Sequence, residues 1–182
     1  PPTMTMGVAD AVSAITGGIG LWATENVGGT IVPANTDKWR LFGGVPIARE
    51  QTGWPSETVV VRNVAVASFN LGRLLVDLMF DGSEIEFLMR GFGASFRLIV
   101  DGQNATASPI AQPSDNLMYR WHVDFGSRLP RHLQLEIADG FAGLTVPNDA
   151  VVWHPTTTAK SLLAFGDSYT QGQASEGATA LT

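Results

Sequence analysis

The chain has 182 residues, of which 45% are hydrophobic and 15% are charged, with 20 glycines and 10 prolines. This composition is typical of a folded, turn-rich protein, and the length allows one complete domain and the beginning of another. A net charge of −6 argues against a nucleic-acid partner, and the absence of cysteine excludes disulfides and thiolate metal sites without deciding the redox compartment.

The first part of the chain, residues 1–55, is expected to be a partly irregular N-terminal extension. Its stretch Gly7–Leu21 is apolar, but it contains Asp10 and follows no basic residue, so it does not match a secretory signal. The stretch is also too short and too interrupted by glycine to span a bilayer, and no membrane partner is expected. With no targeting signal visible, the compartment stays open, a secreted or cell-surface location being one option.

Residues 56–154 contain short segments of alternating apolar and polar residues separated by turn formers. This pattern predicts a jelly-roll-like antiparallel β-sandwich, an architecture of about eight strands. In Arg73–Phe80 every second residue is apolar, and Glu84–Met89 alternates in the same way. Asp81–Gly82, between them, is a strong turn signal, so the two segments are expected to form a hairpin.

Three further strands and one long connection are expected in the sandwich. The strands are Ser95–Asp101, Tyr119–Phe125 and Leu133–Ile137, and the connection is Gln103–Leu117. Loops of that length often hold the ligand of a sandwich. His122 and His132 alternate with core residues, so they are interpreted as ordinary surface residues.

The acidic residues of the sandwich are interpreted as structural. Glu84 and Glu86 lie two apart and share one face of a strand, where a solvated surface is expected. Asp77 and Asp81 are assigned to turn and edge positions. No histidine-based metal spacing is present in the sequence, and no metal site is expected.

Five tryptophans suggest sugar-stacking platforms, because a flat aromatic face suits the apolar face of a pyranose ring. Trp121 alternates with core residues and Trp153 ends a strand, so both are expected to be buried. Trp22, Trp39 and Trp54 lie among glycine and proline in the first third of the chain, where exposure is expected.

Residues 155–160 lack periodicity and are interpreted as a linker, next to which His154 has no assigned role. Residues 161–182 are expected to begin a second domain. There Leu162–Phe165 is continuously apolar, as in a strand that is covered on both faces of a parallel α/β sheet.

The block Phe165-Gly166-Asp167-Ser168-Tyr169-Thr170-Gln171-Gly172 follows this apolar strand. It resembles the first signature block of the SGNH, or GDSL-like, serine hydrolases, whose catalytic domain is a flavodoxin-like α/β fold. The resemblance implies that Ser168 is the nucleophile and that its backbone amide contributes to the oxyanion hole. It also implies that Gly166 and Asp167 shape the nucleophile turn, that no cofactor is needed, and that the catalytic Asp and His lie downstream.

A second resemblance is carried by Phe80–Phe87 and Phe96–Gly102, which are similar to the β-sandwich that precedes the catalytic domain of two-domain carbohydrate esterases. The two resemblances together imply a carboxylic ester hydrolase that removes acyl groups, with acetyl as the expected group, from a carbohydrate through an acyl-enzyme on Ser168. The expected partners are the acylated carbohydrate and the remainder of the hydrolase domain. Without that remainder, the 182-residue piece is expected to be inactive.

Two other functions stay open at this point. The first is a non-catalytic carbohydrate-binding module, in which the sandwich is the working unit. The second is a structural or attachment protein, in which the sandwich forms part of an oligomeric interface. The acyl group, the sugar and the oligomeric state are not determined by the sequence.

Overall fold

The computed structural model describes residues 2–8, 29–34, 36–48, 59–63, 65–66, 69–70, 74–91, 93, 95–138 and 140–156. Every regular element in these ranges is a β-strand, and within them no helix is long and apolar enough to cross a membrane. The predicted start of an α/β domain, residues 161–182, lies outside the described residues.

Twelve of the fourteen strands in the described residues form one hydrogen-bonded sheet, and the other two form a separate two-stranded ribbon. The strands are β1 (Thr3–Val8), β2 (Gly29–Pro33), β3 (Arg40–Phe42), β4 (Gly44–Ala48), β5 (Val59–Asn63), β6 (Ala65–Val66), β7 (Phe69–Asn70), β8 (Leu74–Arg90), β9 (Ser95–Val100), β10 (Gln103–Asn104), β11 (Ile110–Ala111), β12 (Met118–Ile137), β13 (Phe141–Pro147) and β14 (Val151–Trp153). All of their pairings are antiparallel. The mainly antiparallel β prediction is confirmed.

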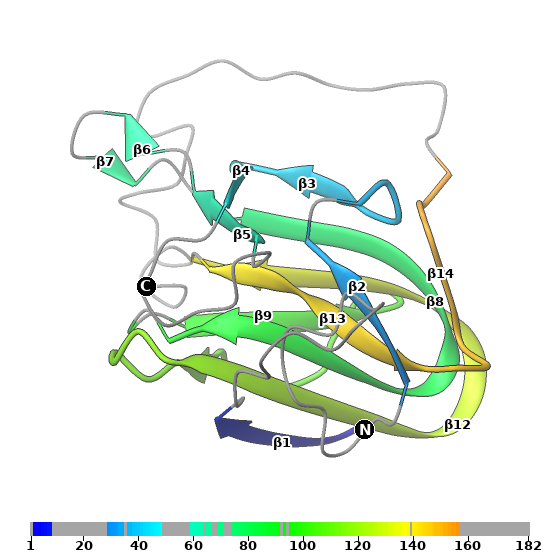
Figure 1. Cartoon of the computed structure of the whole chain (residues 1–182). Coiled ribbons are helices and arrows are strands. Elements are labelled where there is room, and N and C mark those ends of the chain that lie inside the picture. Colours follow the sequence, from blue (N-terminus) through cyan, green and yellow to red (C-terminus); the bar gives the residue numbers. More distant parts are fainter. Residues whose placement is uncertain are drawn as a thin grey trace.

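Two long strands, β8 and β12, pair with each other along nearly their whole length and bend together (Figure 1). The register shifts between Asp124 and Leu129, opposite Gly82–Glu84, so β12 carries extra residues at the bend. Gly126, in this bulge, has φ +72, a left-handed conformation that glycine adopts without steric cost.

The predicted hairpin turn at Asp81–Gly82 is therefore wrong, because both residues lie inside β8. The segments before and after it do not pair with each other; each pairs with one half of β12. An Asp-Gly pair makes a tight turn only where its flanking strands are neighbours in the ladder. For the same reason Tyr119–Phe125 and Leu133–Ile137, expected as separate strands, are two halves of β12.

The bend divides the sheet into two layers, as the register shows. Layer A consists of the first half of β8 and the second half of β12, with β3, β9, β10, β11 and β14. Layer B consists of the second half of β8 and the first half of β12, with β1, β2, β4, β5 and β13. The sandwich is thus one sheet folded over onto itself.

The main core fills the space between the layers. Its apolar side chains come from alternate positions of both long strands, as the sequence alternation predicts. The rings of Phe96 from layer A and Trp121 from layer B meet edge to face, with centroids 4.1 Å apart. Trp39 packs on Phe141 in the same manner and donates from its indole nitrogen to the carbonyl of Ala34. The expectation that Trp121 is buried is confirmed, and the expectation that Trp39 is exposed is wrong.

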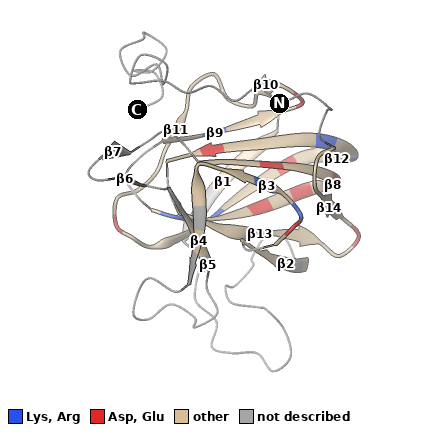
Figure 2. Ribbon diagram, turned by 90° about the horizontal axis from the view of Figure 1, so that it is seen from above, with Lys and Arg blue, Asp and Glu red and all other residues tan. Residues whose placement is uncertain are grey.

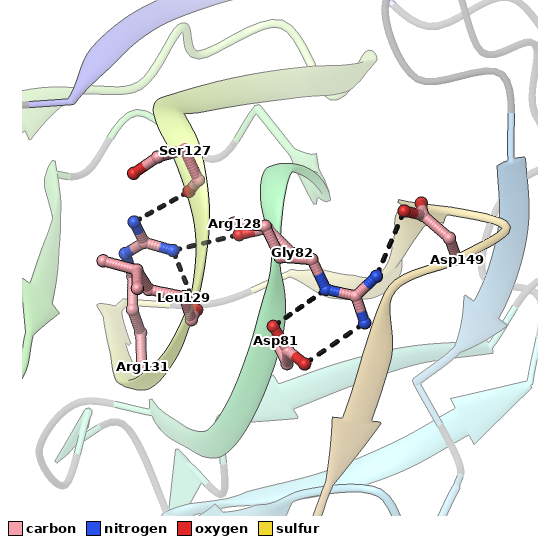
Figure 3. Close-up of polar contacts among 7 residues, drawn as sticks. All are labelled: Asp81, Gly82, Ser127, Arg128, Leu129, Arg131 and Asp149. Atoms are coloured by element: carbon pink, nitrogen blue, oxygen red, sulfur yellow. Dashed lines mark hydrogen bonds and ion pairs between the residues drawn. The ribbon is translucent and has the colours of Figure 1, made fainter.

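Arg131 braces the inside of the bend (Figure 3). Its guanidinium donates to the carbonyl oxygens of Gly82, Leu129 and Ser127, each at 2.9 Å, and lies 4.4 Å from the ring centre of Phe125. Ser127 lies within the bulge, and Gly82 and Leu129 form the first register pair beyond it, so Arg131 bonds to carbonyls of both strands at the bend.

Arg128 spans the outside of the bend. It binds both carboxylate oxygens of Asp81, at 3.0 and 3.2 Å, and one oxygen of Asp149 at 3.1 Å, so it ties β8 and β12 to the turn before β14 (Figure 3). The hydrogen bonds that Arg128 donates to Asp81 are the main cause of a raised pKa of its guanidinium, and the nearby negative charges of Asp81 and Asp149 raise it further. Asp81 is an anchor of the bend and not a turn residue.

Residues 1–55, expected to form a partly irregular extension, contribute four strands to the same sheet. β1 pairs with β12, β2 pairs with β13, β3 pairs with β8 and β4 pairs with β5. The four strands before residue 56 therefore belong to the same hydrogen-bonded sheet as eight of the described strands after it.

Candidate functional site

The residues that the serine-hydrolase resemblance singles out, Gly166, Asp167 and Ser168, lie outside the described residues, so their roles stay predictions. The described part of the chain offers other polar groups, which lie on the two outer faces of the sandwich. Figure 2 marks acidic and basic positions within the long ribbons as well as in the loops. Whether these groups can bind a ligand depends on how each face is exposed.

On the outer face of layer A, Asp77 connects Arg40 and His132. One oxygen of its carboxylate lies 2.6 Å from Nη2 of Arg40, and the other accepts a hydrogen bond from Nε2 of His132 at 2.5 Å. The Asp77 side chain is buried, while Arg40 and His132 stay partly exposed. The placement of Asp77 at a turn or an edge is wrong, because it lies in β8 between β3 and β12.

The exposed side of this network is suited to a polar ligand. Asp77 occupies Nε2 of His132, and the His132 side chain is 35% exposed. Phe42, two residues from Arg40 on the same face, exposes 48% of its surface, and the Arg40 guanidinium lies 5.8 Å from the centre of its ring. The expectation that His132 lies on an outer face is confirmed, and its pairing with Asp77 is what sequence reasoning missed.

The outer face of layer B carries two ion pairs in different environments. His122 and Glu84 lie 2.8 Å apart and are partly exposed. Arg120 and Glu86, one step further along the same strands, lie 3.8 Å apart, and their side chains are 4% and 0% exposed. The prediction of a solvated position is therefore confirmed for Glu84 and wrong for Glu86. The sequence alternation is the same at both positions, so it held no signal of the difference.

The connection Gln103–Leu117 contains two short strands, β10 and β11, which pair with β9. Asp115 accepts hydrogen bonds from the Tyr119 hydroxyl and from the amide of Leu117. Both bonds lower the pKa of the Asp115 carboxyl, and the bond from the Tyr119 hydroxyl is the larger cause. That same bond raises the pKa of the Tyr119 hydroxyl. Both groups are open to solvent, so this end of the connection is fixed by local bonds and not by burial.

His154 ends the described sandwich. Its Nδ1 donates a hydrogen bond to the carbonyl of Pro155 at 2.8 Å. This ring nitrogen therefore has a partner at the start of the linker. Trp153, expected to be buried, is partly exposed. Within the described ranges, no group of three or more metal-binding side chains is close enough to hold a metal ion.

In comparisons with known proteins, no family model matches this chain, and no curated protein matches it at a significant level. The class that the structure defines is an antiparallel β-sandwich built from one folded sheet.

Proposed function

We propose that this chain is the N-terminal portion of a serine esterase that removes acyl groups, with acetyl as the expected group, from a carbohydrate. Ser168 is the nucleophile, Gly166 and Asp167 shape its turn, and its own amide is one oxyanion donor. The observation that supports the proposal is the eight-residue block Phe165–Gly172, directly after an apolar segment.

The fold of the preceding residues is consistent with this proposal. The last described strand of the sandwich, β14, ends at Trp153, and the block follows after a short aperiodic segment. A β-sandwich followed by the start of a catalytic domain is the organisation of the two-domain carbohydrate esterases that the sequence resembles. The substrate class comes from that resemblance alone, because one fold hosts many activities.

The proposed reaction has two steps. The Ser168 oxygen attacks the ester carbonyl, its proton passes to a histidine base downstream of this chain, and the sugar hydroxyl leaves with that proton as the acyl group stays on Ser168. Water then attacks the acyl-enzyme, the histidine takes a proton from the water, and the carboxylic acid is released as Ser168 regains its proton.

A fluorophosphonate probe applied to the complete protein tests the proposal. We expect the probe to label Ser168 and an aryl acetate to be hydrolysed, and we expect Ser168→Ala to abolish both. Ser161→Ala is the matched control, because it removes a hydroxyl at the start of the same apolar segment, and it should leave labelling intact. A complete, folded protein that neither reacts with the probe nor hydrolyses the ester would contradict the proposal.

A second candidate function, a non-catalytic carbohydrate-binding module, is favoured by the outer face of layer A. There an exposed aromatic ring, Phe42, adjoins the network of Arg40, Asp77 and His132, which provides both a stacking surface and hydrogen-bonding groups. Binding of acetylated glycans that is lost in Phe42→Ala would support this function. Leu117→Ala is the control, since Leu117 is also 48% exposed but lies in the connection before β12.

The two tests are independent. Glycan binding without probe labelling favours the binding module, and labelling without dependence on Phe42 favours the esterase. If both are negative in a folded protein, a structural or attachment role becomes the best explanation.

A further inference from the structure

Two short strands, β3 and β14, lie one after the other along the same side of β8 in layer A. Because β12 pairs with Leu74–Gly82 without interruption, both short strands lie on the opposite side of β8 from β12 (Figure 1). β3 pairs with Leu75–Asp77, and β14 pairs with Met79–Asp81. Two segments that are far apart in the sequence therefore form one continuous border of layer A.

Alternate residues of this border point to the outer face of layer A. Leu41 and Val152 pack on the main core, so the residues on either side of them face outward. In the order of their β8 partners, these outward residues are Phe42, Arg40, Trp153 and Val151, which we call the edge row. Phe42 and Val151, at the two ends of the row, expose 48% and 50% of their surfaces, and the two residues between them are partly exposed.

The two aromatic residues of the edge row are separated by a distance that one sugar ring does not span. Leu75 and Met79, the β8 partners of Phe42 and Trp153, are four residues apart, which corresponds to about 13 Å along a strand. A pyranose ring is built from single bonds of about 1.5 Å, so it is much shorter than this separation. A glycan that stacks on both rings is therefore a chain that runs along β8.

Between the two rings, the surface offers hydrogen-bonding groups that are already held in place. Arg40 lies opposite Asp77, and His132 reaches the same carboxylate from β12. The side chains of Arg40 and His132 are 26% and 35% exposed. Because Asp77 fixes both side chains, their free polar groups can meet sugar hydroxyls with little further loss of conformational entropy.

The charges beside the edge row are balanced. The Arg40 guanidinium lies 2.6 Å from the Asp77 carboxylate, and Arg128 binds Asp81 at 3.0 Å and Asp149 at 3.1 Å. A ligand with carboxylate or sulfate groups would have to compete with these aspartates for the two arginines. Charge complementarity therefore favours a neutral glycan.

We propose that the edge row is the binding site of a neutral glycan chain of several sugar units, which lies along β8 and stacks on both Phe42 and Trp153. This inference rests on the carbohydrate-binding function put forward as the second candidate above. It adds Trp153 as a second stacking platform, Arg40 as the polar contact between the platforms, and a chain, in place of a single sugar, as the ligand.

Titration calorimetry of the full chain with neutral oligosaccharides tests the proposal. The probes are cello-, xylo- and manno-oligosaccharides, with and without acetyl groups, from the monosaccharide to the hexasaccharide. We expect the affinity for at least one series to rise with chain length and to level off once the chain reaches both rings. Phe42→Ala and Trp153→Ala should each weaken binding of that hexasaccharide roughly tenfold, and the double variant roughly a hundredfold, because rings this far apart act independently.

Two further variants serve as controls. Leu117→Ala should leave every affinity unchanged, because Leu117 is exposed to the same extent as Phe42 but lies outside the edge row. Trp153→Phe keeps an aromatic ring at the second platform and should retain most of the affinity. If Trp153→Ala does not fold, as judged by its melting curve, the dependence on chain length in the unaltered protein decides the outcome.

Equal affinity for the monosaccharide and the hexasaccharide would overturn the proposal and leave the binding module in place. A folded Trp153→Ala variant that binds like the unaltered protein would do the same, as would tighter binding of oligogalacturonate, a chain of acidic sugars, than of every neutral chain. If none of these glycans binds, both this proposal and the binding module are wrong, whereas the esterase is decided separately by the labelling of Ser168.

Discussion

The two outer faces of the sandwich have the same strand alternation and opposite environments. On layer A, the Arg40–Asp77–His132 network keeps two of its three members partly exposed, and Phe42 is open to solvent. On layer B, Glu86 and Arg120 are fully covered and lie among apolar side chains. The difference teaches that polar residues on one side of a strand do not by themselves mark a solvent face.

The contrast also separates two uses of charged residues. A partly exposed network keeps groups that can exchange partners with a ligand, whereas a buried pair is fixed by the cost of leaving either charge alone. We therefore expect substitutions on layer B to change mainly stability, and substitutions on layer A to change mainly binding.

The largest expected effect comes from breaking the buried pair. Glu86→Leu removes the carboxylate from a buried ion pair, which should lower the free energy of unfolding by about 3–5 kcal/mol in urea denaturation. The double variant Glu86→Leu with Arg120→Met should recover most of this loss. Glu84→Leu, at the partly exposed pair, should cost only about 0–1 kcal/mol, and an equal loss at both positions would remove the distinction between the two pairs.

The next effect compares apolar residues across the two faces. Leu88→Ala should lower the free energy of unfolding by about 2–5 kcal/mol, because it opens a cavity among the buried side chains of Val60, Met118 and Ala142. Phe42→Ala, on the open face, should change it by less than about 0.5 kcal/mol. Thermal unfolding of both variants checks this, and similar melting temperatures would mean that the faces are equally covered.

A smaller effect is expected at the centre of the layer A network. Asp77→Asn removes the carboxylate that binds Arg40 and His132, but both partners can turn to water, so the expected loss is about 1–2 kcal/mol. The control is Gln134→Ala, because Gln134 is the next outward-facing residue after His132 along β12. A loss as large as that of Glu86→Leu would show that layer A is covered as well.

The smallest effect is expected at the solvent-open pair of Asp115 and Tyr119. Since the folded protein lowers the pKa of the Asp115 carboxyl, the pair stabilises the fold above the unfolded pKa of about 3.9 and loses that effect as the pH falls through the folded pKa. The raised pKa of Tyr119 has the opposite sense: its contribution is present below about pH 10 and is lost as the pH rises through the folded value. Tyr119→Phe should raise the pKa of the Asp115 carboxyl toward its ordinary value, as followed by carboxyl NMR, and an unchanged titration would show that the hydroxyl is not the cause.

Much of the core was predictable from local pattern. Leu74, Val76, Leu78 and Phe80 share the inner side of β8, and Ile85, Phe87 and Met89 continue it beyond the bend, as the alternation indicates. The bend itself was not predictable, since Asp81–Gly82 carries the sequence of a hairpin turn while its strand partners come from 118–137. The candidate nucleophile Ser168 remains a prediction from its motif.

The sequence by itself determined the antiparallel strands and their inner faces, because a strand's two-residue period is a local property that each segment shows on its own. Only the tertiary structure decided that β8 and β12 fold over as continuous strands, and that Glu86 is buried while Glu84 is not. Both outcomes depend on which distant segment lies against a given strand or face. Such contacts are set by the packing of the whole sheet, and no local pattern records them.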